Sequence, residues 1–235
     1  MSPKIRIACR WGVLLVGIAS AALAAVDRPS PTIAVRYSFD GWFTGAVADA
    51  GDRYPLRRRG TVSFAPRAGG WAARYPARCA GAGCPRGILE SDAVAALNPG
   101  TRAVRYGASV LMAPADTGDG ANVLQKGFST GGVTQFKLQV DGAAGRPSCV
   151  VASKTDIYRV IAPVTVADGR WHALQCARSS TELSISVDGG RQGAVAVPAR
   201  VSIVNSEPLR IGGKSLSVDN DQYAGLVDDV FVVID

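Results

Sequence analysis

The fold is decided by three segments near the C-terminus: WHALQCARSSTELSISVDGG (residues 171–190), VNSEPLRIGGK (204–214) and DQYAGLVDDVFVVID (221–235). In the first segment, apolar and polar residues alternate from 183 to 187, and Asp188-Gly189-Gly190 ends the alternation. A period of two that ends at an Asp-Gly turn is typical of antiparallel strands. Residues 226–234 are apolar on both parities, which predicts a closing strand in the middle of a sheet, covered on both faces.

The rest of the chain predicts further strands and little helix. Alternation is clearest at 133–140, and strands are also expected at 33–39, 61–64, 71–75, 87–90, 103–112, 123–128 and 147–153. Residues 40–60 are rich in Gly and Asp and predict a loop. No stretch keeps a period of 3.6, and no internal repeat is present. The sequence therefore predicts one all-β domain, a two-sheet antiparallel sandwich.

The N-terminus has the pattern of a secretory signal. Lys4, Arg6 and Arg10 precede an apolar run over 12–19, and small residues follow at 21–25. The run is shorter than the roughly 20 residues that span a bilayer. We therefore expect cleavage of a signal peptide (1–25), a short linker (26–32) and a secreted, extracellular domain (33–235) that does not insert into a membrane.

The chain carries a formal net charge of +7, which would fall to +4 without the signal, because three basic and no acidic residues leave with it. The one basic cluster is Arg57-Arg58-Arg59, and no long basic run alternates with aromatic residues. We therefore expect no nucleic-acid partner. We interpret the triplet as a solvated loop, with recognition of an acidic glycan or a negative cell surface as the alternative.

Four cysteines remain after the expected cleavage: Cys79, Cys84, Cys149 and Cys176. An even number in an exported chain predicts disulfides, and four cysteines permit three connectivities. We favour Cys79–Cys84, which closes the small loop CAGAGC, and Cys149–Cys176, which joins two apolar extended segments. A metal site is the alternative, but the chain has a single His and no Cys pair with the C-x2-C spacing.

A family likeness rests on the order of several motifs: YSFD (37–40), DAGD (49–52), FKLQV (136–140), DGRWHALQCAR (168–178), LSISVDG (183–189), PLRIGGK (208–214) and YAGLVDDVFV (223–232). In this order they resemble the laminin G-like, concanavalin A-like lectin/glucanase jelly roll over essentially the whole mature chain. The resemblance implies two antiparallel sheets of six or seven strands, packed face to face. It also implies a secreted glycan- or protein-binding module, with a minority of relatives that cleave glycosides.

The resemblance further implies a structural calcium ion that ties the loop after the first strand to the last strand. The matching positions are Asp49 and Asp228, whose carboxylates have the oxygen ligands that calcium prefers. The alternative is that Asp49 caps a turn and Asp228 is solvated. Asp219 and Asp221 are weaker candidates.

Retaining enzymes of this fold place carboxylates in an E-x-D-x-x-E pattern on one strand. Glu90-Ser91-Asp92 begins this pattern, but position 95 is Ala95. The other glutamates are Glu182 and Glu207, and an inverting pair of aspartates stays open. We interpret the single His172 as structural. Because no other catalytic motif is present, we expect no enzymatic activity.

Binding would then use aromatic and polar side chains. The candidates are Trp42 beside Asp40, and Arg105, Gln135 and Lys137, which should face outward on neighbouring strands. The alternatives are that Trp42 packs under a loop and that the polar side chains form a solvated sheet face. We expect a non-catalytic module for a carbohydrate or cell-surface polymer. A protein-interaction or structural domain is the alternative, and a glycoside hydrolase is less favoured.

Overall fold

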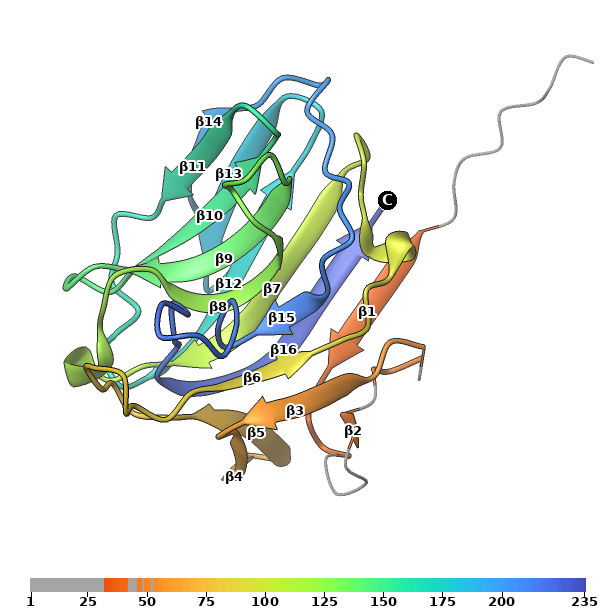
Figure 1. The fold of residues 1–235 in the computed structure, drawn as a ribbon. Helices are drawn as coiled ribbons and strands as arrows, with labels where there is room; N and C mark the ends of the chain where they lie inside the picture. The colour runs from red at the N-terminus through yellow and green to blue at the C-terminus, as the bar shows by residue number, and fades with distance from the viewer. Residues whose placement is uncertain (1–31, 42–45, 48, 52) are drawn as a thin grey trace, which may run out of the picture. The chain divides into compact units, whose positions relative to one another are not determined.

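The computed structural model describes residues 32–41, 46, 47, 49–51 and 53–235. The expected signal peptide and nearly all of the expected linker lie outside this part of the chain. The described residues form two antiparallel sheets, which confirms the predicted all-β sandwich (Figure 1). Their helical elements are two short 3-10 turns, η2 (Ala95–Leu97) and η3 (Pro114–Asp116).

Each sheet contains eight strands, where the resemblance implied six or seven. Sheet A contains, in spatial order, β14 (Gly190–Ala196), β13 (Glu182–Val187), β12 (Trp171–Arg178), β7 (Val104–Leu111), β16 (Gly225–Ile234), β5 (Gly70–Tyr75) and β4 (Ser63–Arg67), and β1 (Ile33–Tyr37) also pairs with β16. Sheet B contains β11 (Ile157–Ile161), β10 (Arg146–Ala152), β9 (Gln135–Asp141), β8 (Ala121–Gly127), β15 (Leu209–Ile211), β6 (Gly87–Glu90), β3 (Leu56–Gly60) and β2 (Ala46–Val47).

The closing strand β16 lies in the middle of sheet A, as predicted. It pairs with β7 along one edge, and with β5 and then β1 along the other. A β-bulge interrupts its pairing with β7 between Asp228 and Phe231, and Asp229 has a positive φ of 49°. The bulge adds residues to one strand and changes which side chains face the core. Val227 and Val230 are therefore both buried.

The prediction that β16 is covered on both faces is wrong. Its outer face carries Leu226, Phe231 and Val233, and each is only half-buried. The prediction failed because an apolar face need not be covered: much of a protein's accessible surface is apolar. This face of sheet A remains open to a ligand.

The expected loop over 40–60 contains two strands of sheet B, β2 and β3. The basic triplet lies on β3, where Arg57–Gly60 are exposed and pair with β6. β11 was not predicted, and three of its five residues are exposed. Each of these strands has a single buried residue, Leu56 in β3 and Val160 in β11. Neither strand therefore shows the apolar alternation that predicts a strand from sequence.

Turn residues and cross-sheet contacts fix the arrangement. Asp188 and Gly189 both have positive φ, as expected for a two-residue hairpin turn between β13 and β14. The Tyr106 hydroxyl on β7 donates a hydrogen bond to the Val150 carbonyl on β10, 3.1 Å away, and so joins the two sheets through the core. Tyr106 also packs against Phe136 of β9.

Both predicted disulfides are present. Cys79–Cys84 closes a short loop, and Cys149–Cys176 connects β10 of sheet B to β12 of sheet A. The second bond therefore crosses the core between the layers. Among the described residues, no helix is long and apolar enough to cross a membrane.

Candidate functional site

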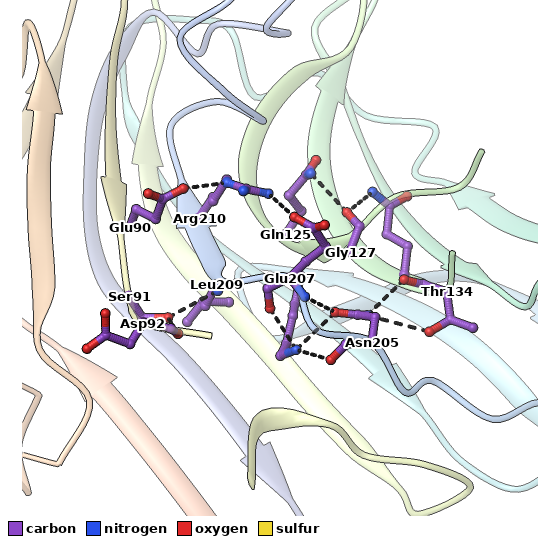
Figure 2. Close-up of polar contacts among 12 residues, drawn as sticks. Glu90, Ser91, Asp92, Gln125, Gly127, Thr134, Asn205, Glu207, Leu209 and Arg210 are labelled. Atoms are coloured by element: carbon purple, nitrogen blue, oxygen red, sulfur yellow. Dashed lines mark hydrogen bonds and ion pairs between the residues drawn. The ribbon is translucent and has the colours of Figure 1, made fainter. Parts of the chain in front are cut away.

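The outer face of sheet B carries a row of paired charges across three strands (Figure 2). Arg210 on β15 bonds Glu90 of β6 through Nε at 2.7 Å, and Glu207 through Nη1 at 3.0 Å. The second oxygen of Glu90 accepts a bond from Arg59 at 2.8 Å. Both carboxylates are thus engaged by guanidinium groups.

The same face holds two of the predicted binding residues. Gln135 donates a hydrogen bond to the Gly127 carbonyl at 3.0 Å, and Lys137 forms an ion pair with Asp221 at 3.0 Å. Both point away from the core as predicted, but Gln135 is 4% and Lys137 8% exposed. The loop between β15 and β16 contacts this face, because its Asp221 binds Lys137. Neither side chain is presented to a large ligand.

This buried layer is incompletely satisfied. Asn122 and Gln125 on β8 are buried, and both amide atoms of Asn122 and the Oε1 of Gln125 have no hydrogen-bond partner among the described residues. The Asn122 backbone N–H donates to the Asp221 carbonyl at 2.8 Å, which holds the loop in place. Buried amides of this kind usually bind ordered water.

Lys126 on β8 is a buried cation whose cross-strand partners, Phe136 and Leu209, are core residues. Its ammonium group donates to four oxygens: the side chains of Asn98 and Asn205 at 2.8 and 3.0 Å, and the carbonyls of Asn205 and Glu207 at 3.2 and 2.8 Å. Burial lowers the pKa of Lys126 to about 8, against the opposing effect of the Glu207 charge. The contacts give Lys126 a structural role.

The outer face of sheet A is more open. It holds a groove of about 530 Å³, here called the sheet-A groove. Its polar lining is Arg36, Arg105, Ser109, Gln175, Ser186 and Asp229, and its apolar lining includes Phe231, Val233, Ala173 and Leu174. Arg105, a predicted binding residue, therefore lies at this groove.

Sequence reasoning missed the aromatic residue at the centre of the groove, because Phe231 was assigned to a fully covered strand. Its ring lies against Gly107 of β7: a Cβ atom on Gly107 would come within 2.7 Å of the ring. The Arg36 guanidinium lies 5.9 Å from the ring centroid. The available signal was the Asp228-Asp229 pair inside an apolar strand, which indicates a bulge and a change of parity.

Asp229, which lines the groove, belongs to a cluster of charged residues. Arg67 on β4 binds Asp228 at 2.5 Å and Asp229 at 2.8 Å, and its guanidinium stacks on Trp171 at 4.1 Å from the ring centroid. Burial raises the pKa of Asp228, although the Arg67 hydrogen bond opposes this. The Ser109 hydroxyl also donates to Asp229 at 3.0 Å. The carboxylates of this cluster are therefore already paired.

The structure does not bring Asp49 and Asp228 into a shared contact. Asp49 caps a turn, since it accepts backbone hydrogen bonds from Gly51, Arg53 and Tyr54 at 3.1, 2.6 and 2.8 Å. Asp228 is bound by Arg67. In the described part of the chain, no group of three or more His, Cys, Asp or Glu could hold a metal ion. A calcium ion at Asp228 would have to share or replace Arg67, and the calcium prediction stays untested.

The weaker candidates for calcium are engaged elsewhere. Asp219 and Asp221 both bind Lys214, at 3.2 and 3.3 Å, and Asp221 also binds Lys137. Trp42 lies outside the described residues. Asp40, its neighbour, accepts a hydrogen bond from the Trp71 backbone at 2.9 Å.

His172 sits between two carboxylates. Its Nδ1 is 2.8 Å from Asp188 and its Nε2 is 3.1 Å from Asp168. Burial lowers the pKa of His172, but the hydrogen bonds and charges of Asp188 and Asp168 raise it more, so the net shift is upward. The two aspartates lie in the turns before β12 and after β13, so the imidazolium joins these turns.

Residues 91–233 match the concanavalin A-like lectin/glucanases superfamily. The match covers more than half of the chain. The chain belongs to this superfamily. No curated protein sequence matches the chain.

Solved structures share this fold. Domain 4 of AbnA, a GH43 extracellular arabinanase from Geobacillus stearothermophilus in complex with arabinotriose, has a TM-score of 0.62 and 14% identity, with 85% of this chain and 91% of that chain covered. The binding domain of Paraclostridial Mosquitocidal Protein 1 has a TM-score of 0.62 and 10% identity, with 85% and 47% covered. Botulinum neurotoxin type C, whose cell entry depends on interaction with two ganglioside molecules, has a TM-score of 0.60 and 8% identity, with 86% and 47% covered. The chain thus spans about half of the two toxin chains, and these likenesses concern the fold.

Proposed function

We propose that this chain is a secreted, non-catalytic module that binds a carbohydrate or cell-surface polymer in the sheet-A groove. The observation that carries the proposal is the composition of the groove. Its volume of about 530 Å³ combines an apolar floor around Phe231 with donors from Arg36, Arg105 and Gln175. Ligand sites typically have volumes of about 300–1,000 Å³, an apolar lining and a few polar groups that orient the ligand.

The pairing of the carboxylates supports a non-catalytic role. Glycoside hydrolysis needs two carboxyl groups that face the scissile bond, one of which can donate a proton. On sheet B, Glu90 and Glu207 share the Arg210 guanidinium instead, and Asp92 forms an ion pair with Arg57. Among the described residues that line the sheet-A groove, the one carboxylate is Asp229, which is bound by Arg67.

Two observations support export and a glycan partner. Two disulfides are typical of proteins that fold in an oxidising compartment, and they agree with the signal pattern at the N-terminus. Domain 4 of AbnA has the same fold in complex with arabinotriose, and botulinum neurotoxin type C has it with ganglioside molecules, so the fold supports saccharide recognition in other proteins.

A glycan array with the purified mature protein tests the proposal. We expect binding to at least one class of oligosaccharide, and a loss of about tenfold in affinity for Phe231→Ala, which corresponds to about 1.4 kcal/mol. Ile157→Ala on sheet B is the control for removing a partly exposed apolar side chain. If wild type and Phe231→Ala bind with equal affinity, the sheet-A groove is not the binding site. Release of reducing ends from any bound polysaccharide would contradict the non-catalytic role.

A protein-binding role is the second candidate, and the edge of sheet B favours it. β11 is the last strand of this sheet, and Ile157 and Ile161 on it are 58% and 45% exposed. An exposed edge strand with apolar side chains can pair with a strand from another protein. Loss of a captured protein in the Ile157→Lys variant, with unchanged glycan binding, would support this second role.

A further inference from the structure

Two arginines flank Phe231 on the floor of the sheet-A groove. Arg36 of β1 lies directly across from Phe231 of β16, and Gly107 of β7 lies across from Phe231 on the other side. Arg105 is two residues before Gly107 on β7, so it faces the same way. The stems of the two arginines therefore rise from strands about 10 Å apart, one on each side of β16.

These guanidinium groups are available to a ligand. Among the described residues, Arg36 forms no ion pair, and its guanidinium group lies over the Phe231 ring. Arg105 has one ion pair, at 3.4 Å to the side chain of Asp235, and both side chains are nearly half exposed. A solvent-exposed pair of this kind contributes little and exchanges easily for another anion.

Among the described residues that line the groove, Asp229 is the one carboxylate against these two guanidinium groups. Its Oδ2 atom already accepts bonds from Arg67 and Ser109 at 2.8 and 3.0 Å. The remaining lining includes small side chains, Ala173 and Ser186, which leave room above the sheet. A guanidinium group binds a carboxylate through two parallel hydrogen bonds, whereas a neutral sugar offers only hydroxyl groups.

We infer that the ligand of the sheet-A groove is an acidic oligosaccharide whose uronate carboxylates bind Arg36 and Arg105, one on each side of Phe231. This inference rests on the proposed function and assigns the class of carbohydrate. The separation of the two arginines requires at least two sugar residues, so a monosaccharide binds weakly. Arg57, Arg58 and Arg59 do not form this site, because they lie on β3 of sheet B.

Isothermal titration calorimetry with three probes tests the inference. The probes are a trimer of galacturonic acid, the same trimer with its carboxyl groups reduced to hydroxymethyl groups, and a sulfated trisaccharide that has no carboxyl groups. We expect the uronate trimer to bind at least about tenfold more tightly than the reduced trimer. We also expect its binding to weaken as salt is raised, because ions screen the exposed arginines. Arg36→Gln and Arg105→Gln should each lower its affinity about tenfold.

Arg159→Gln is the matched control, since Arg159 is an exposed arginine on β11 of sheet B, away from the groove, and is also paired with a carboxylate. It should bind the uronate trimer as wild type does, and the melting temperatures of all variants show that they fold. Equal binding of the uronate and reduced trimers, or unchanged binding by both groove variants, overturns the inference but keeps the proposed function. Tighter binding of the sulfated probe overturns the assignment to a carboxylate. Absence of binding to any array glycan overturns both proposals.

Discussion

Two buried cations, Lys126 and Arg178, join the same pair of loops. Lys126 binds oxygens of Asn98, Asn205 and Glu207. Arg178 donates to the carbonyls of Thr101 and Val201, both at 2.6 Å. Each cation therefore bonds both the segment near residue 100 and the segment near residue 203, where an isolated bridge joins Gly100 to Ile203. Buried charges are costly unless their bonds are satisfied, and here carbonyl and amide oxygens satisfy most of them.

Replacing Lys126 should loosen these loops. Lys126→Met removes the cation but leaves four acceptors buried, so we expect the free energy of unfolding to fall by about 2–4 kcal/mol. Urea unfolding measures this loss. Lys154→Met is the control, because Lys154 is exposed and its replacement should change stability by less than about 0.5 kcal/mol. Equal stability of the two variants would show that the Lys126 contacts contribute nothing.

His172 should make stability depend on pH. Its folded pKa is raised above the ordinary value of 6.5, so the imidazolium stabilises the folded state. This contribution is fully present below about pH 6.5 and is lost as the pH rises through the folded pKa. We expect His172→Gln to melt about 2–4 °C lower than wild type at pH 5, and close to wild type at pH 9. A difference that stays constant between these values would contradict the role of the charge.

At the scale of the element, the bulge in β16 places two aspartates beside Arg67 and opens the sheet-A groove. Asp228 has only 9% of its side chain exposed. Its buried negative charge would be costly to folding without the ion pair with Arg67. The same irregularity turns Phe231 outward, toward Arg36. A single bulge thus determines both a buried ion pair and the aromatic floor of the groove.

Removing Arg67 should leave a buried, unpaired carboxylate. We expect Arg67→Met to lower the free energy of unfolding by about 3 kcal/mol at pH 7. The Asp228 pKa is already raised by burial, so the penalty exists above the folded pKa and disappears as the pH falls toward the unfolded value of 3.8. Urea unfolding at pH 7 and pH 4 checks this. The double variant Arg67→Met/Asp228→Asn should recover most of the loss at pH 7, and failure to recover would show that Arg67 acts through packing on Trp171.

The strands with strong alternation could be predicted from the sequence. One face of each such strand packs against the other sheet, as in β7, β9, β12 and β13. This packing explains why apolar and polar residues alternate along them. β3 was missed because Arg57–Arg59 give it no apolar pattern, and it forms only because Leu56 is buried and β6 supplies a partner. Local sequence does not contain that pairing.

At the scale of the whole molecule, the site was harder to predict than the fold. The sheet-A groove is assembled from β1, β7, β12 and β16, which are distant in the sequence. Arg105 was identified because it lies on a strongly alternating strand. Gln135 and Lys137 were placed on the correct side of their strand, but the contact of the loop around Asp221 with that face is a tertiary feature. Phe231 required knowledge of the bulge.

The predicted calcium ion also concerns the whole molecule, because it would connect the first loop to the last strand. If an ion bridges Asp49 and Asp228, the melting temperature should fall by several degrees in a chelator and recover with added calcium, since a ligand of the folded state stabilises it. Asp49→Asn should abolish this difference. Equal melting temperatures with chelator and with calcium would contradict the bridge and leave Arg67 as the cation partner of Asp228.

The cystine between β10 and β12 determines how the protein must be produced for all of these measurements. Cross-linking a loop of this length contributes about 3–4 kcal/mol by restricting the unfolded chain. In a reducing cytoplasm both thiols would stay apart, and recombinant material would fold with a much smaller margin. Expression in a periplasm or another oxidising host, followed by a thiol assay that detects no free cysteine in the mature chain, is therefore the necessary starting point.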